Sequence, residues 1–304
     1  MSSTVPPALP GERLALDGPA GPLTVYVRGQ GPALLLVHSV NAAASAAEVR
    51  PLFERAAATH TVFAPDLPGF GLSDRSDRPY TPRLMTDALH QTLRAVRARC
   101  GVAPVDALAV SLGCEFLARA AVEQPAGIGR LALVSPTGFM GSRAWRGAPG
   151  STRTVPGLLP LLRGPGWGGA LFRGLTKPGV IRYFLRRTWG AREIDEALWA
   201  YDVQVVRAPG AEFAPLHFLS GGLFSADIHD VYDALAQPVW VAHGDRGDFT
   251  DYRGLAAFAH KPNWQVSPLH AGALPHFEPA SGYLEAFDRW LADGASAGVS
   301  APRR

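Results

Sequence analysis

Short apolar runs recur along this chain and alternate with segments whose apolar residues stand three or four positions apart. Runs of the first kind, bounded by glycine, proline and polar residues, are typical of β-strands, and the second spacing is typical of helices. The predicted strands are Leu23–Val27, Ala33–Val37, Thr61–Ala64, Val105–Val110, Arg130–Val134, Val239–Ala242 and Trp264–Pro268. Because strands and helices alternate, we predict an α/β fold with a mostly parallel central sheet flanked by helices.

Helix-start signals stand between several of these strands. Ser45 followed by Glu48 has the form of a capping box, which predicts a helix that continues to Ala58. Thr81 and Pro82 predict an N-cap with proline at the first helical position, and apolar residues at helical spacing follow them. Further helices are predicted over Leu112–Glu123 and from about Pro279 to Leu291.

The alternation stops between residues 140 and 228. This segment is rich in Gly, Pro, Trp and Arg, with short helical patches. We therefore predict a core formed by residues 1–139 and 229–292, and a helical cap or lid formed by residues 140–228. Residues 293–304 are small and polar, and we expect a disordered tail. An insertion at this point would cover the strand ends, where open α/β sheets bind their ligands.

Composition narrows the class of protein. Hydrophobic residues make up 47% and charged residues 18%, which favours a globular domain over a disordered chain. The net charge is only +3 and no long basic run occurs, so we expect no nucleic-acid partner. No apolar stretch approaches the roughly 20 residues of a membrane span. The N-terminus lacks a signal-peptide pattern and the two cysteines stand apart, so we expect a cytoplasmic protein.

The strongest chemical signal is Ser111. The segment Ala109-Val110-Ser111-Leu112-Gly113 joins a predicted strand to a predicted helix, as the nucleophile turn G-x-S-x-G does. Small residues are needed around the serine because neighbouring backbones crowd such a turn. The Leu112 N–H would point at a developing oxyanion near a helix N-terminus. The alternative is a serine that simply caps the helix.

Two further motifs resemble those of the α/β-hydrolase superfamily. The run Asp66-Leu-Pro-Gly-Phe-Gly-Leu-Ser-Asp74 is similar to the family's D-x-P-G-x-G-x-S loop, and Leu35-Leu-Val-His-Ser-Val-Asn41 is similar to its strand followed by H-G-x. The resemblance covers about residues 22–140 and 236–292. It implies the α/β-hydrolase fold, a second oxyanion-hole N–H at Val40, and a structural role for His38.

The resemblance also implies an acid after the strand Val239–Ala242. His243-Gly-Asp-Arg-Gly-Asp-Phe249 is similar to the family's H-G-x-x-D turn, although it is one residue longer. We choose Asp248 as the triad acid, and Asp251 and Asp245 are the alternatives.

The family's catalytic histidine precedes the last helix. In the matching stretch, Gly272 to Pro279, Ala273 takes the usual catalytic position and His276 follows three residues later. The chain order Ser111, acid, His276 is the order of this fold, so we predict His276 as the base. His270 is an alternative, and the absence of any catalytic histidine is another.

Together these residues predict a serine hydrolase that cleaves a carboxylic ester or similar acyl bond through an acyl-enzyme. His276 would take the Ser111 proton, and the Val40 and Leu112 N–H groups would bind the oxyanion. The alternatives are a carbon–carbon bond hydrolase with the same triad and a small-molecule-binding protein with a degenerate triad.

No metal or phosphate-loop motif is present in the sequence, so we expect neither a cofactor nor a metal. The partner we expect is a small-molecule substrate, and the aromatic residues of the predicted cap would suit an apolar or aromatic acyl compound. These aromatic residues are Trp145, Trp167, Phe172, Tyr183, Phe184, Trp189 and Trp199.

Overall fold

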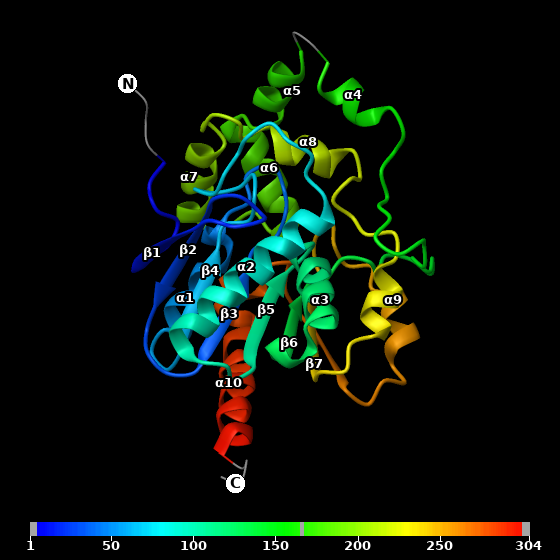
Figure 1. Cartoon of the computed structure of the whole chain (residues 1–304). Helices are drawn as coiled ribbons and strands as arrows, with labels where there is room; N and C mark the ends of the chain where they lie inside the picture. The colour runs from blue at the N-terminus through cyan, green and yellow to red at the C-terminus, as the bar shows by residue number, and fades with distance from the viewer. Residues whose placement is uncertain (1–4, 165–166, 300–304) are drawn as a thin grey trace.

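The computed structural model describes residues 5–164 and 167–299, and its centre is an eight-stranded sheet (Figure 1). The strand order is β1-β2-β4-β3-β5-β6-β7-β8; β2 runs antiparallel to both of its neighbours and the other pairs are parallel. The strands are β1 (Glu12–Leu16), β2 (Leu23–Arg28), β3 (Ala33–Val37), β4 (Thr61–Pro65), β5 (Val105–Val110), β6 (Ile128–Val134), β7 (Val239–Gly244) and β8 (Trp264–Leu269). The predicted α/β class and its mostly parallel sheet are confirmed.

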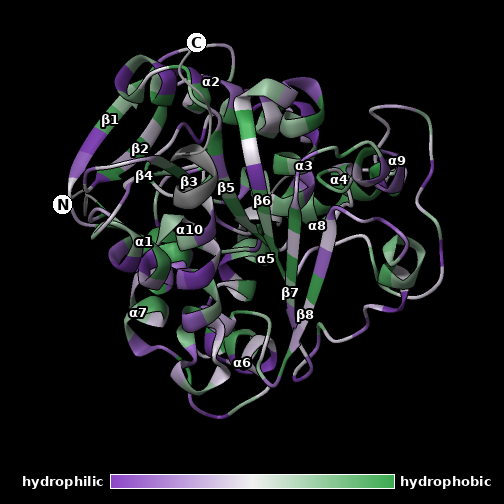
Figure 2. Ribbon diagram, turned by 90° about the horizontal axis from the view of Figure 1, so that it is seen from below, coloured by the Kyte–Doolittle hydropathy of each residue, from purple (hydrophilic) through white to green (hydrophobic). Residues whose placement is uncertain are grey.

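Strand β1 is the one that the hydrophobic pattern missed. It forms the edge of the sheet, none of its side chains is fully buried, and its hydrophilic first half is coloured purple in Figure 2. An edge strand with so little buried surface carries only a weak apolar signal, because the pattern reports burial rather than backbone pairing.

Helices cover both faces of the sheet. Leu35 and Val37 of β3 pack toward α2 (Pro82–Cys100) and α3 (Gly113–Glu123), whereas Leu34 and Leu36 pack toward α1 (Arg50–Ala56) and α10 (Tyr283–Val299). This alternation follows from the two-residue period of a strand. Because both faces are covered, β3 reads as a continuous apolar run, which is typical of a parallel strand in the middle of a sheet.

The segment between β6 and β7 is helical, and α4 to α8 lie together at one end of the sheet (Figure 1). The division of the chain at residues 139 and 228 into core and cap stays a prediction. The helices of this segment are α4 (Leu158–Leu162), α5 (Gly168–Leu175), α6 (Pro178–Trp189), α7 (Glu196–Val205), α8 (Phe213–Leu219) and α9 (Ile228–Asp233).

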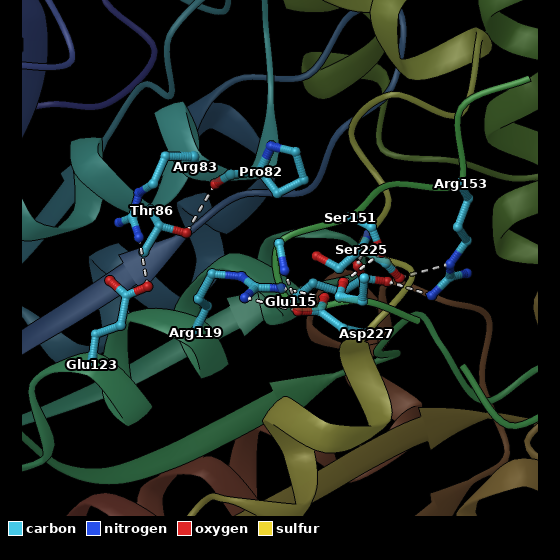
Figure 3. A network of polar contacts seen from close by, with 12 residues as sticks. Pro82, Arg83, Thr86, Glu115, Arg119, Glu123, Ser151, Arg153, Ser225 and Asp227 are labelled. Atoms are coloured by element: carbon cyan, nitrogen blue, oxygen red, sulfur yellow. Dashed lines mark hydrogen bonds and ion pairs between the residues drawn. The ribbon is translucent and has the colours of Figure 1, made fainter. Parts of the chain in front are cut away.

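Helix α3 ties both ends of this helical segment to the core (Figure 3). The buried Glu115 carboxylate accepts hydrogen bonds from the Ser225 N–H at 2.8 Å and from Arg153 at 3.2 Å. One turn further along α3, Arg119 donates two hydrogen bonds to Asp227, at 2.6 and 3.3 Å. The helix that begins directly after Ser111 therefore positions the ends of the segment above it.

The predicted helix from Ser45 begins in a different way. Ser45 accepts a hydrogen bond from the Ala47 N–H at 3.3 Å, and the first turn is a 3₁₀ helix, η1 (Ala46–Val49), before α1 ends at Ala56. Glu48 does not complete the capping box. Its carboxylate instead binds Ser39 and Asn41, because a buried charge takes the strongest donors within reach.

The predicted disordered tail is wrong for residues 293–299, where α10 continues. Arg130 explains part of this extension: it pairs with Asp106 at 2.6 Å and donates to the Trp290 carbonyl at 2.7 Å, which fixes the helix against the sheet. Once a helix is anchored, each added residue gains a hydrogen bond without a new nucleation cost. Residues 300–304 of the predicted tail lie outside the described residues.

Helix α7 packs on η1 through charged groups. Its N-cap residue Asp195 accepts a hydrogen bond from Arg50 at 2.7 Å. Asp202, further along the same helix, is buried, and its Oδ1 has no hydrogen-bond partner in the described part of the chain. Burial first, and then the charge of Glu48, raise the pKa of the Asp202 carboxyl well above its usual range. Helix α7 is therefore best packed when Asp202 is protonated.

We expect Arg119→Met to lower the free energy of unfolding by about 3 kcal/mol, because it leaves the buried Asp227 without its charged partner. The matched control is Arg83→Met, which removes the more exposed ion pair with Glu123 that Figure 3 also shows, and should cost at most about 1 kcal/mol. Urea unfolding of both variants measures the difference. Equal losses would contradict the assignment of Arg119 as an anchor of the helical segment.

We expect Asp202→Asn to stabilise the protein increasingly as the pH rises from about 5 to about 8. The pKa of Asp202 is raised in the folded chain, so above the ordinary carboxyl pKa the unfolded chain releases a proton that the folded chain retains. Wild-type stability then falls with rising pH, and the asparagine variant lacks this contribution. Thermal unfolding midpoints at the two pH values test this, and a difference that is independent of pH would contradict it.

Candidate active site

Ser111 lies at the junction of β5 and α3 with a left-handed backbone conformation, φ 52°. Such a conformation costs a non-glycine residue about 1–3 kcal/mol and persists only where the surroundings enforce it. The Ser111 N–H donates to the Val134 carbonyl at 2.8 Å, which fixes the turn against β6. Ser135, at the end of β6, has a similar φ of 48°. Two neighbouring strand ends are thus held in the same rare conformation.

The small residues around Ser111 have the roles that the motif requires. Ala109 is completely buried between strands, and a Cβ on Gly113 would lie 2.4 Å from the His38 carbonyl oxygen. No side chain fits at position 113 without moving the backbone of residue 38. The close approach also shows that the loop after β3 lies directly against the nucleophile turn.

His38 holds this loop in place. Its ring is buried, Nε2 accepts a hydrogen bond from the Leu67 N–H at 2.9 Å, and Nδ1 lies 2.6 Å from the Ser39 carbonyl oxygen. Burial lowers the pKa of His38 to about 4, so the ring is neutral at physiological pH. His38 therefore links the loop after β3 to the Asp66–Asp74 loop and is not free to act on Ser111.

The two predicted oxyanion donors have no partners. Within the described residues neither the Val40 N–H nor the Leu112 N–H donates a hydrogen bond. Leu112 is the N-cap residue of α3, where backbone N–H groups lack partners inside the helix. Both groups are therefore available to an anionic oxygen, and their role as an oxyanion hole stays a prediction.

The side chain of Glu48 binds the loop that carries Val40. The carboxylate is buried and accepts from the Ser39 N–H at 2.8 Å and from the Asn41 side-chain amide at 2.6 Å. Burial raises the pKa of Glu48, and these hydrogen bonds oppose the rise. The sequence pattern assigned Glu48 to a capping box; the signal that could have singled it out is a charged residue within a run of buried alanines.

The candidate acids lie in a loop after β7 and have different partners. Asp248 forms an ion pair with Arg187 of α6 at 2.5 Å. Asp251 accepts hydrogen bonds from the Gly141 N–H and from Arg253. Asp245 lies 3.1 Å from Nδ1 of His270, and both of these side chains are exposed.

His276 is 1% exposed, and its Nε2 lies 2.7 Å from the Glu48 carbonyl oxygen. Its Nδ1 is buried and has no hydrogen-bond partner among the residues that the structure describes, and burial lowers the pKa of the ring to about 4. Across residues 5–164 and 167–299 no hydrogen bond joins His276 to Ser111 or to Asp248. The three predicted triad residues are therefore not brought into contact with one another, and their catalytic roles stay predictions.

The last turn of α6 lies against the loops that follow β7 and β8. The Thr188 carbonyl accepts a hydrogen bond from the Ala273 N–H at 2.9 Å. A Cβ on Gly247 would lie 2.4 Å from the Arg187 carbonyl oxygen, and one on Gly272 would lie 2.5 Å from that of Trp189. Small residues in both loops thus allow α6 to approach the places where the resemblance puts acid and base.

A cavity of about 10 Å³, room for one water molecule, lies between the loop after Asn41 and the end of α7. Among the described residues that line it, Arg75 is the only charged one. It donates to the Gly71 carbonyl and, at 3.0 Å, to the Val205 carbonyl. The helical segment is thus closed over the loop that carries Val40.

In the part of the chain that the structure describes, no three His, Cys, Asp or Glu side chains gather closely enough to bind a metal ion. None of the described helices has the length and apolar character needed to cross a membrane.

Comparisons with known proteins agree with this fold. Residues 32–156 match the family described as alpha/beta hydrolase fold. N-formylmaleamate deformylase of Pseudomonas putida is 28% identical over 278 residues, which cover 88% of this chain and 91% of the relative.

Among solved structures, a serine hydrolase involved in carbazole degradation superposes with a TM-score of 0.69 at 16% identity, covering 92% of this chain and 98% of the other. The 2-hydroxy-6-oxo-6-phenylhexa-2,4-dienoate hydrolase of Rhodococcus sp. strain RHA1 gives 0.66 at 19%, covering 93% and 98%. These likenesses concern the fold. The strand order, the serine turn between β5 and α3 and the match over residues 32–156 together show that the chain has the α/β-hydrolase fold.

Proposed function

We propose that this protein is a hydrolase that cleaves an acyl bond, a carboxylic ester or a related amide, with Ser111 as its nucleophile. The observation that carries this proposal is the left-handed Ser111 between β5 and α3, followed directly by the Leu112 N–H, which has no partner among the described residues. Backbone strain of this kind is concentrated at functional sites. A serine that merely caps a helix adopts an ordinary extended conformation, so the strain at Ser111 favours the nucleophile over the cap.

The reaction would proceed through an acyl-enzyme. The Ser111 oxygen attacks the acyl carbon, its proton passes to a base, and the Val40 and Leu112 N–H groups stabilise the oxyanion. The leaving group departs with a proton, and water then releases the acid and restores the serine. Removing one oxyanion donor typically lowers kcat by about 10²–10³-fold, so these two N–H groups would supply much of the rate.

Two histidine–aspartate pairs are candidates for the proton acceptor. His276 and Asp248 are the predicted pair, but each is bonded to another group. The Asp245–His270 pair has the Nδ1-to-carboxylate arrangement of a triad and leaves Nε2 free. For His270 to reach Ser111, the loop must turn inward and break the hydrogen bonds that Asp245 and Arg246 donate to the Ala271 carbonyl.

The choice of substrates rests on two considerations. The relative's name specifies a deformylase of N-formylmaleamate, so N-formyl amides belong beside esters in a substrate panel. Of the aromatic residues expected to shape the pocket, Phe172 and Trp189 are buried, whereas Trp167, Tyr183 and Phe184 are about half exposed. A preference for apolar or aromatic acyl groups thus stays a prediction.

A second candidate function is binding without turnover. Ala273 at the family's histidine position, and the hydrogen bond of His276 to Glu48 instead of Ser111, favour it. Carbon–carbon bond cleavage of a diketone remains a variant of the first candidate, because it uses the same nucleophile and oxyanion hole.

We expect a fluorophosphonate probe to label the wild-type protein and not Ser111→Ala. The same pair should differ in hydrolysis of a panel of p-nitrophenyl esters of varied chain length, N-formyl amides and a vinylogous diketone acid. Gel fluorescence and product formation measure the two effects. No labelling together with no hydrolysis across the panel would exclude the hydrolase and leave the binding protein.

We expect Ala273→His to increase the labelling rate of Ser111 by about 10-fold or more, because a positioned base contributes about 10²–10⁴-fold to catalysis. Ala273→Gln is the matched control, since it adds a side chain of similar reach against the last turn of α6 without a basic nitrogen. Comparable rates in both variants would show that position 273 no longer faces the nucleophile.

A further inference from the structure

We infer that Glu48 is the positioning residue of the loop that carries Val40, residues 38–45, which we call the oxyanion loop. In this inference His276 acts through Glu48 rather than as the base for Ser111. This inference rests on the proposed function of Ser111. It assigns a role to a buried carboxylate that the acyl-transfer mechanism does not otherwise use, and it gives His276 a role other than the predicted one.

Glu48 contacts the oxyanion loop on both sides of Val40. One carboxylate oxygen binds the backbone N–H of Ser39 at 2.8 Å, and the other binds the Asn41 amide at 2.6 Å. Asn41 in turn accepts a hydrogen bond from the Ala43 N–H at 2.7 Å, which extends the support along the loop. Because the residues before and after Val40 are both held, the direction of the Val40 N–H is fixed while the N–H itself stays free.

Glu48 binds the loop at the position where the family's motif has glycine. The family's H-G-x has serine at position 39 here, so the backbone at Ser39 has less conformational freedom than glycine would give. A charge-assisted hydrogen bond to the Ser39 N–H is stronger than one to a neutral acceptor. The carboxylate therefore adds, from outside the loop, to the restraint that serine already places on the backbone.

Two neighbouring side chains hold the short helix that carries Glu48. The Glu48 carbonyl oxygen lies 2.7 Å from Nε2 of His276, which requires the tautomer with a proton on Nε2. At the start of η1, the Ala46 N–H donates to the Asp66 carboxylate at 2.8 Å. The short helix that carries Glu48 is thus fixed by a donor from the loop before α10 and by an acceptor from the loop after β4.

His276 in this arrangement is a hydrogen-bond donor with a buried ring. In the described part of the chain its Nδ1 lone pair has no partner, and Ser111 is not bonded to either nitrogen. The low pKa of about 4 that burial gives this ring agrees with a neutral, fixed tautomer. A donor of this kind can be replaced by an amide, whereas a base cannot.

The histidine test compares His276→Gln with His276→Ala. Glutamine places an N–H near the position of Nε2 but has no basic nitrogen, so we expect it to keep the wild-type labelling rate within about 3-fold. Alanine removes the donor and should lower the rate by about 10-fold or more. If His276 is instead the base, both variants lose about 10²–10⁴-fold and the inference is overturned.

The glutamate test compares Glu48→Gln with Glu115→Gln. In the first variant an NH₂ group faces either the Ser39 N–H or the Asn41 amide, so donor meets donor and one contact is lost. Glu115 is also fully buried with several partners, but it holds the helical segment rather than the loop. We expect Glu48→Gln to lower the labelling rate about 10-fold or more, and Glu115→Gln to leave it unchanged.

Hydrogen exchange provides a readout that does not depend on activity. Peptides covering residues 38–45 should exchange faster in Glu48→Gln and in His276→Ala than in wild type, and at the wild-type rate in Glu115→Gln and in His276→Gln. A wild-type protein that the probe does not label would refute the proposed function while this measurement still decides the positioning role. Unchanged exchange in Glu48→Gln would overturn the inference.

Discussion

The left-handed backbone of Ser111 is the constraint around which the rest of the structure is arranged. It costs about 1–3 kcal/mol, so the neighbouring elements must hold it. The Val134 carbonyl binds its N–H, and the crowding of Gly113 by the His38 carbonyl excludes any larger residue in the turn. The parallel sheet, the loop after β3 and helix α3 all meet at this point.

Much of the core could be predicted from the sequence because its signals are local. Strands such as Ala33–Val37 are continuous apolar runs, and the small residues around Ser111 report crowding within one turn of chain. The edge strand β1 was missed because none of its side chains is fully buried. The extension of α10 was missed because it depends on Arg130, which is distant in sequence.

The candidate site was harder to predict because its contacts join residues far apart along the chain. The partner of His276 is a backbone carbonyl 228 positions earlier, and no residue pattern specifies a backbone acceptor. Asp248 was selected from the motif, but its contact is with Arg187 of the inserted segment, whose packing the family resemblance does not describe. Glu48 fitted a local capping rule, and the stronger long-range donors at the oxyanion loop prevailed.

The helical segment and the nucleophile turn are physically coupled. Helix α3 begins at the turn and carries Glu115 and Arg119, which hold the two ends of the segment. At the other side of the site, α7 places the buried Asp202 near Glu48, and α6 packs on the loops after β7 and β8. Helix α3 therefore supports the nucleophile turn at its start and the ends of the segment further along, whereas the loop that carries Val40 has its own support in Glu48.

The central claim is that Ser111 is a nucleophile poised beside free N–H donors, and a covalent intermediate tests it most directly. The protein can be mixed with p-nitrophenyl acetate, quenched in acid, digested and analysed by mass spectrometry. The account predicts one acetyl group on the peptide that contains Ser111, and none on it in Ser111→Ala. An unmodified Ser111 peptide, or acetylation confined to other residues, would contradict the account.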